Sequence, residues 1–129
     1  MAAGLSVEQG KALNRAVADL VVKAEADSAV FCDETGNVLA QAGMGQAMHV
    51  QTIAALGAGS FVATRELAAL IGETTFLSVH HQGAKTNIFV RSVASGFFVL
   101  VVFGHKTTAG LVKLYVERMG EEVRPVLQE

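Results

Sequence analysis

The sequence predicts a single α/β domain of the α+β kind, in which a five-stranded antiparallel sheet is flanked by three helices. Three segments repeat apolar residues at helical spacing, and five short apolar runs have the length of strands. The connections between them are short, so the elements can share one sheet and its cores. With 129 residues, 51% of them hydrophobic, the chain has the size of one domain, residues 1–129.

Composition and charge exclude several classes of function. The formal net charge is −2, so no basic field would attract nucleic acid. The single cysteine, Cys32, cannot form an internal disulfide, and the N-terminus leads directly into a charged helix pattern. We therefore expect a cytoplasmic protein. The apolar stretch 43–71 is long enough to span a membrane, but polar residues such as Gln51 interrupt it, so we expect a packed helix and no membrane insertion.

The first half of the chain predicts a helix, a hairpin and a second helix. Ser6 and Gln9 form a capping-box pattern at the start of a helix over 6–25. Two apolar runs, 28–33 and 37–42, are separated by a glycine-containing turn and predict a hairpin. After a glycine-rich loop over 43–46, a helix is expected over 47–71, ended by Gly72.

The second half predicts three strands and a last helix, so the element order is α-β-β-α-β-β-β-α. The strands are expected over 74–81, 86–93 and 97–104, and the last of them is apolar on both faces and should be central. Thr107 or Thr108 can cap the final helix, which Pro125 would kink or end. The expected buried stripe of this helix comprises Leu111, Leu114, Tyr115, Met119 and Val123.

Residues that often carry chemistry do not form a recognisable site in the sequence. His80 and His81 are neighbours on a strand and must point to opposite faces, and the other histidines, His49 and His105, stand apart. Cys32 is expected to be buried, and Asp33 with Glu34 is expected to be a solvated pair at a turn. The loop 43–45 lacks the residues of a phosphate loop. We predict no catalytic residue, metal or cofactor.

The informative feature is the second helix, which has one bulky and one small-residue face. Its bulky stripe, expected to pack on the sheet, comprises Val50, Ile53, Gly57, Phe61 and Leu67. Its small-residue stripe comprises Thr52, Ala55, Gly59 and Ala63. This stripe could accommodate another helix of the same domain or an identical helix of a second copy, and we favour the second copy. The following strand carries no lysine or proline to guard an edge, so it could also pair across a two-fold axis.

The order and spacing of these segments resemble the roadblock / dynein light chain domain family, particularly its small stand-alone bacterial members. The segments that carry the resemblance are AVFCDETGNVLAQAG (29–43), the long small-residue helix, TNIFVRSVASGFFVLVVF (86–103) and TTAGLVKLYVERM (107–119). The resemblance implies a profilin-like fold, with the second helix on one face of the sheet and the terminal helices on the other.

The resemblance also implies a function and an interface. Roadblock-like proteins act as scaffolds or regulators of Ras-like small GTPases, and some bacterial dimers accelerate GTP hydrolysis. By this likeness a homodimer interface would contain Thr52, Ala55, Gly59 and Ala63 together with Leu77, Val79 and His81. No catalytic residue is transferred, and Arg65, near a helix end, is expected to be solvated rather than an arginine finger. The alternative function is an architectural dimerisation module that leaves nucleotide turnover unchanged.

Overall fold

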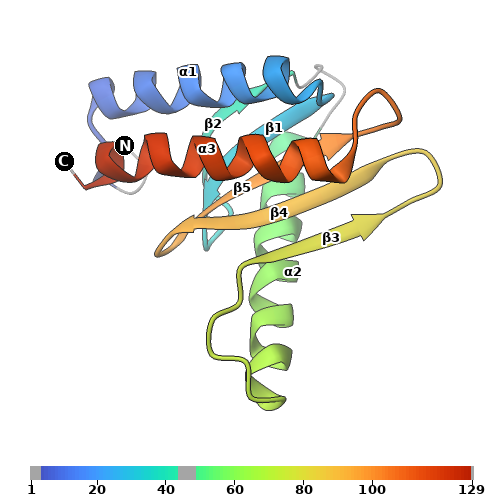
Figure 1. Ribbon diagram of the computed structural model, residues 1–129. Coiled ribbons are helices and arrows are strands. Elements are labelled where there is room, and N and C mark those ends of the chain that lie inside the picture. The colour runs from blue at the N-terminus through green and yellow to red at the C-terminus, as the bar shows by residue number, and fades with distance from the viewer. Residues whose placement is uncertain (1–3, 44–48, 129) are drawn as a thin grey trace.

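The computed structural model describes residues 4–43 and 49–128 (Figure 1). The expected loop over 43–46 and the expected helix start at 47 therefore lie largely outside the described residues. The element order matches the sequence prediction. The elements are α1 (Val7–Ala24), β1 (Ser28–Asp33), β2 (Val38–Ala42), α2 (Val50–Leu70), β3 (Ser78–Gln82), β4 (Asn87–Ala94), β5 (Phe97–Phe103) and α3 (Ala109–Leu127).

The five strands form one antiparallel sheet in the order β2-β1-β5-β4-β3. The central position predicted for β5 is confirmed. Residues of β5 alternate between two hydrophobic cores: Val99 and Val101 face one side, and Phe98 and Leu100 face the other. A strand that is apolar on both faces is stable only when both faces are covered.

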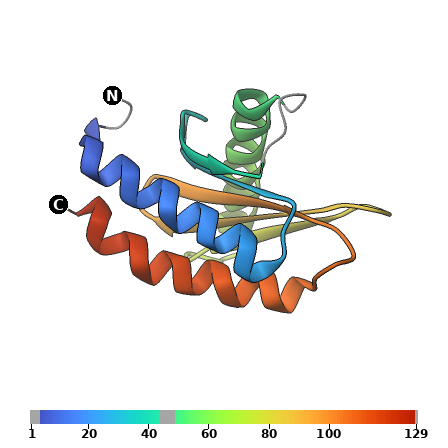
Figure 2. The same cartoon turned by 90° about the horizontal axis from the view of Figure 1, so that it is seen from above.

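Helices cover the two faces unequally, as the resemblance implied. Helices α1 and α3 lie side by side on one face, and α2 lies alone on the other (Figure 2). α1 and α3 run antiparallel, because the side chain of Gln9 near the start of α1 donates to the backbone oxygen of Val126 near the end of α3 at 2.8 Å. The predicted caps are present: Ser6 and Gln9 bond reciprocally at 2.7 and 3.1 Å, and Thr108 accepts from Leu111 N at 3.2 Å.

Several predicted details of the helices are wrong. On α3, Leu111 and Leu114 are 43% and 42% exposed, because the face toward the sheet carries Val112 and Val116, one or two positions along the helix. On α2, Leu67 is 61% exposed and Ala54 and Ala58 are buried in its place. Pro125 does not end α3, which continues for two further residues, and the alternative that it kinks the helix stays a prediction.

The predicted start of β3 is also wrong. Residues 74–77 are outside the strand, which begins at Ser78. Figure 1 gives the reason: the C-terminal half of α2 protrudes beyond the edge of the sheet, so the chain must use these residues to return to it. Leu77 makes the first contact, since its backbone oxygen accepts from Ser92 N at 3.0 Å.

Helix α2 is also the one described helix long and apolar enough, by length and composition, to cross a membrane. Its N-terminal half is instead packed on the sheet, where Phe61 is fully buried against Phe98, with ring centroids 4.6 Å apart. Only 22% of its most apolar window is buried inside the domain, so most of this helix faces outward.

Glycine at position 36 allows the β1–β2 turn to touch α2. Gly36 has φ +88°, and a Cβ atom there would lie 2.6 Å from the Cα of Ala55. We expect Gly36→Ala to lower the free energy of unfolding by roughly 2–4 kcal/mol, because backbone strain and overlap with a helix backbone act together. Urea unfolding measures the change.

Gly96→Ala is the matched control, because Gly96 has φ +80° and open space around its missing side chain. Its cost should be about 1–2 kcal/mol, the strain alone. Equal costs for the two variants would contradict the close contact between Gly36 and α2.

Candidate functional site

The small-residue stripe of α2 is exposed along its whole length. Thr52, Ala55, Gly59 and Ala63 are all exposed, and a side chain added at Gly59 would meet nothing within 4 Å. The two other helices lie across the sheet (Figure 2), so no helix of the described chain covers the stripe. The β1–β2 turn touches α2 at Ala55, but nothing lies within 4 Å of the missing side chain of Gly59, so the helix offers there a surface that another backbone can approach closely.

Large apolar side chains extend this surface along the protruding half of α2. Leu70 and Ile71 are 84% and 81% exposed, and Leu67 is exposed as well; Leu56, in the first half of the helix, is also exposed. Leu77, on the return to the sheet, adds to them. Contiguous exposed apolar side chains are typical of protein interaction sites.

Strand β3 is an edge of the sheet, as predicted, and adjoins this surface. It pairs with β4 on one side, while its other side has no partner strand in the described chain. Val79 packs against the core beneath α2, and His81 approaches Ser60 of α2. The predicted opposite orientation of the two histidines is confirmed, because His80 points to the other face and its ring centroid lies 5.8 Å from that of Phe103.

A groove of about 260 Å³ lies between α2 and the strands next to this edge. Its lining is almost entirely apolar and comprises Ile53, Leu56, Gly57, Ser60, His81, Ile88, Val90 and Leu100. The two polar side chains, Ser60 and His81, are 3.5 Å apart, but the Ser60 hydroxyl already donates to the backbone oxygen of Gly57 at 3.0 Å. No carboxylate lines the groove to orient His81, so the pair lacks the third member of a nucleophilic triad.

Asp33 organises the β1–β2 turn. Its carboxylate accepts from the backbone N–H groups of Thr35 and Asn37, both at 3.0 Å, and from both side chains. Partial burial acts to raise the pKa of Asp33, but these hydrogen bonds outweigh burial and lower the pKa below its usual value. The hydrogen bonds of Asp33 therefore hold the turn together, and Asp33 is not one of a pair of catalytic carboxylates.

Arg65 and Glu34 form an ion pair that the sequence did not indicate. Arg65 Nη2 lies 2.9 Å from Glu34 Oε1, and the Arg65 guanidinium lies 5.9 Å from the Phe61 ring centroid. The expectation that both side chains are simply solvated is corrected, because each is 44% exposed and bound to the other. The pair joins α2 to the β1–β2 turn. Its partners are 31 residues apart, so local spacing carries no signal for it.

The remaining candidates are dispersed. No group of three or more His, Cys, Asp or Glu side chains in the described residues could hold a metal ion. Cys32 is buried, as predicted, and lies in the core beneath α2. The residues that the structure does bring together are those of the α2 stripe, the protruding end of α2 and the β3 edge.

The fold and this surface define the class of the protein. The chain has the roadblock/LC7 fold, a profilin-like α/β domain, and the resemblance stated from the sequence is confirmed. It is similar to Myxococcus xanthus MglB, with 29% identity, a TM-score of 0.89 and 96% and 93% of the two chains covered. The gliding protein MglB of Thermus thermophilus matches with 26% identity, a TM-score of 0.87 and 96% and 94% covered.

Two more distant structures show the fold alone. A roadblock/LC7 domain from Streptomyces avermitilis has 23% identity and a TM-score of 0.83, with 90% of this chain and 98% of that chain covered. Acanthamoeba castellanii profilin IA has 15% identity and a TM-score of 0.60, with 84% and 93% covered. The sequence matches no protein-family model and no curated protein.

The chemistry of Cys32 gives a test of the core beneath α2. Burial, with a smaller contribution from the Asp33 charge, raises the pKa of the Cys32 thiol from 9.0 to about 12. We expect a thiol reagent at pH 8 to label Cys32 only after unfolding, because the native thiol is both covered and protonated. Native stability should also fall as the pH rises from 9 towards 12, where the unfolded chain ionises and the folded one does not.

The control variant carries Cys32→Ala and Ser95→Cys, which places one thiol on the exposed β4–β5 turn. It should react at the rate of a free thiol. Native labelling of Cys32 at the same rate as this control would contradict its burial.

Proposed function

We propose that this protein is a homodimer that pairs through the small-residue stripe of α2 and the edge strand β3. The observation that carries the proposal is the juxtaposition of an exposed small-residue helix face with an unpaired sheet edge. A two-fold axis at that edge would pair the β3 strands of two copies antiparallel and join two sheets into one. The expected contacts are Thr52, Ala55, Gly59 and Ala63 on the helix and Leu77, Val79 and His81 at the edge.

The protruding half of α2 supports this arrangement. A helix that extends past its own edge strand would reach over the sheet of a partner joined at that edge (Figure 1). There Leu67, Leu70 and Ile71 could lose their exposure to water, which would stabilise the dimer by roughly 25 cal/mol for each Å² of apolar surface buried. The apolar groove beside α2 would provide space for side chains of the partner helix.

We further propose that the dimer acts in the cytoplasm as a non-catalytic regulator or scaffold of a Ras-like small GTPase. The likeness to roadblock-family proteins supports this role, and so does the likeness to the gliding protein MglB over nearly the whole of both chains. A structure of MglB with a tetrameric arrangement, 25% identical with a TM-score of 0.88, supports self-association.

The arrangement of Arg65 argues against an arginine finger. A finger must be free to enter the nucleotide site of the partner, whereas Arg65 is bound to Glu34 and lies against Phe61. The alternative role, an architectural dimerisation module in a multiprotein assembly, requires the same surface but no effect on GTP hydrolysis.

Gly59→Leu tests the dimer. The new side chain has open space in a single copy, and leucine favours a helix over glycine by up to about 1 kcal/mol, so the fold itself should not be weakened. Two helices can no longer approach closely at this position, so the α2 contact should be lost, and we expect a mass in light scattering of about half that of the unchanged protein.

Gly10→Leu is the matched control, since Gly10 also lies in a helix with nothing within 4 Å of its missing side chain. It should keep the mass of the unchanged protein. A Gly59→Leu protein that dimerises as tightly as the control would refute the interface.

A pull-down from the native host followed by a GTP hydrolysis assay tests the regulatory role. We expect a small GTPase among the captured proteins, and a change of about tenfold or more in its hydrolysis rate when the dimer is added. Arg65→Ala should retain this effect, and Gly59→Leu should lose it. A dimer that captures no GTPase would favour the architectural role instead.

A further inference from the structure

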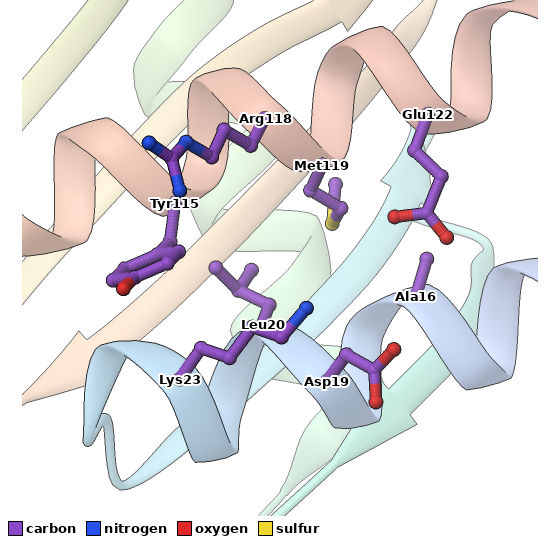
Figure 3. A pocket seen from close by; sticks show the side chains of 8 residues that line it. All are labelled: Ala16, Asp19, Leu20, Lys23, Tyr115, Arg118, Met119 and Glu122. Atoms are coloured by element: carbon purple, nitrogen blue, oxygen red, sulfur yellow. The ribbon is translucent and has the colours of Figure 1, made fainter.

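A second groove lies on the opposite face of the molecule, between α1 and α3. It has a volume of about 260 Å³, and Figure 3 shows the residues that line it. Its floor is apolar and is formed by Ala16 and Leu20 of α1 and Met119 of α3. The proposed function does not use this groove, because the whole sheet separates it from α2 (Figure 2).

The charged side chains around this groove are sorted by sign along its length. Figure 3 shows Arg118 and Tyr115 toward one end and Asp19 and Glu122 toward the other; the Lys23 side chain starts at the first end, and its amino group lies near the middle. The sorting follows from the antiparallel helices: Asp19 precedes Lys23 by one turn on α1, and Glu122 follows Arg118 by one turn on α3. Charges of opposite sign are therefore displaced by about 6 Å along each helix, in the same direction.

These four charges are not paired with one another. The ion pairs found among the described residues are Arg65–Glu34 and Arg91–Glu117, so none of the four groove charges has an ionic partner within 4.0 Å. Arg118 instead lies against Tyr115, with its guanidinium 5.6 Å from the ring centroid. All four charged residues are exposed, so a second molecule can reach them.

A groove with a basic end and an acidic end is complementary to itself. When a second copy is turned by 180° about an axis that lies in the interface and crosses the centre of the groove at right angles, its acidic end faces the basic end of the first copy, and the reverse holds at the other end. Lys23 and Arg118 of each copy would then meet Asp19 and Glu122 of the other. Such a contact is isologous and satisfies both sets of charges at once.

Exposed apolar side chains lie near the charges on α3. Leu111 lies one turn before Tyr115, and Leu114 lies one turn before Arg118. They would supply the apolar part of an interface in which the charges fix the register.

We propose that the α1–α3 face is a second self-association surface, at which two copies of this chain meet groove to groove. Because this face and the α2 face lie on opposite sides of the sheet, one copy can use both. Dimers formed through α2 and β3 are then joined to one another through α1 and α3. If the α2 contact does not form, the α1–α3 contact by itself produces a simple dimer.

Two charge-reversed variants test the proposal. Lys23→Glu with Arg118→Glu makes both ends of the groove acidic, and Asp19→Lys with Glu122→Lys makes both ends basic. Opposed like charges should weaken the association of each variant with itself by about a hundredfold or more. Light scattering over a concentration series should show the unchanged protein growing beyond a dimer and both variants stopping at the dimer.

Restoration distinguishes this specific contact from general damage. An equal mixture of the two variants should again form the larger species, because an acidic groove then faces a basic one. The four substitutions combined in one chain exchange the two ends and should restore self-association as well. Lys106→Glu with Lys113→Glu lowers the net charge by the same amount as Lys23→Glu with Arg118→Glu, but outside the groove. This control should behave as the unchanged protein.

Several results would overturn the proposal. An unchanged protein that never exceeds a dimer and is made monomeric by Gly59→Leu has only the α2 contact, and the groove is then open to a different protein. Charge reversals that leave the mass of the assembly unaltered, or a mixture that fails to restore it, would also refute the contact. If Gly59→Leu abolishes the α2 contact but the protein still associates through the α1–α3 groove, the result would support the groove contact as independent of the α2 interface.

Discussion

The two-sided burial of β5 is the constraint on which the rest of the structure depends. Val99 and Val101 are buried toward α1 and α3, and Phe98 and Leu100 toward α2, so neither face of the sheet can be left open to water. The described residues form three long helices for two faces, and two of these helices cover one face. The single helix on the other face must cross several strands to cover them, and it leaves the edge beside β3 thinly covered.

Small residues determine how closely α2 can cover that face. Gly57 lies directly over the side chain of Leu100, and a Cβ atom at this position would overlap the Leu100 side chain. Ala54 and Ala58 are buried beside it, and Phe61 fills the remaining space against Phe98 and Phe76. Close approach explains why the buried face of this helix is small at one end and aromatic in the middle. Farther along the helix, Leu67, Leu70 and Ile71 remain exposed.

Most of the fold could be predicted because local sequence patterns determine its helices, strands and turns. Helix caps such as Ser6 with Gln9 and turn glycines such as Gly36 act within a few residues, and alternation along β5 reports its two buried faces directly. The errors arise where position in space decides. Leu67 fits an apolar stripe but lies beyond the sheet, and Leu111 differs from Val112 by only about 100° of rotation about α3.

Only part of the candidate site could be predicted from the sequence. The small-residue stripe of α2 is a pattern within one helix, so the sequence contains it, and the structure adds that no helix in the described chain covers it. The Arg65–Glu34 pair and the sorted charges between α1 and α3 each join elements far apart in the chain, and only the packing of those elements brings the charges together. Residue spacing cannot report such pairs.

The two faces of the molecule differ in the physics that would govern association. The α2 face is apolar and built from small side chains, so contact there would depend on close packing and on water release, which moderate salt does not weaken. The α1–α3 face carries exposed charges, whose attraction is screened within about 8–10 Å at physiological ionic strength. One copy of this chain therefore combines a surface suited to a persistent pairing with a surface suited to an association that responds to its ionic surroundings. The sheet between them, buried on both sides around β5, holds the two surfaces in a fixed relation.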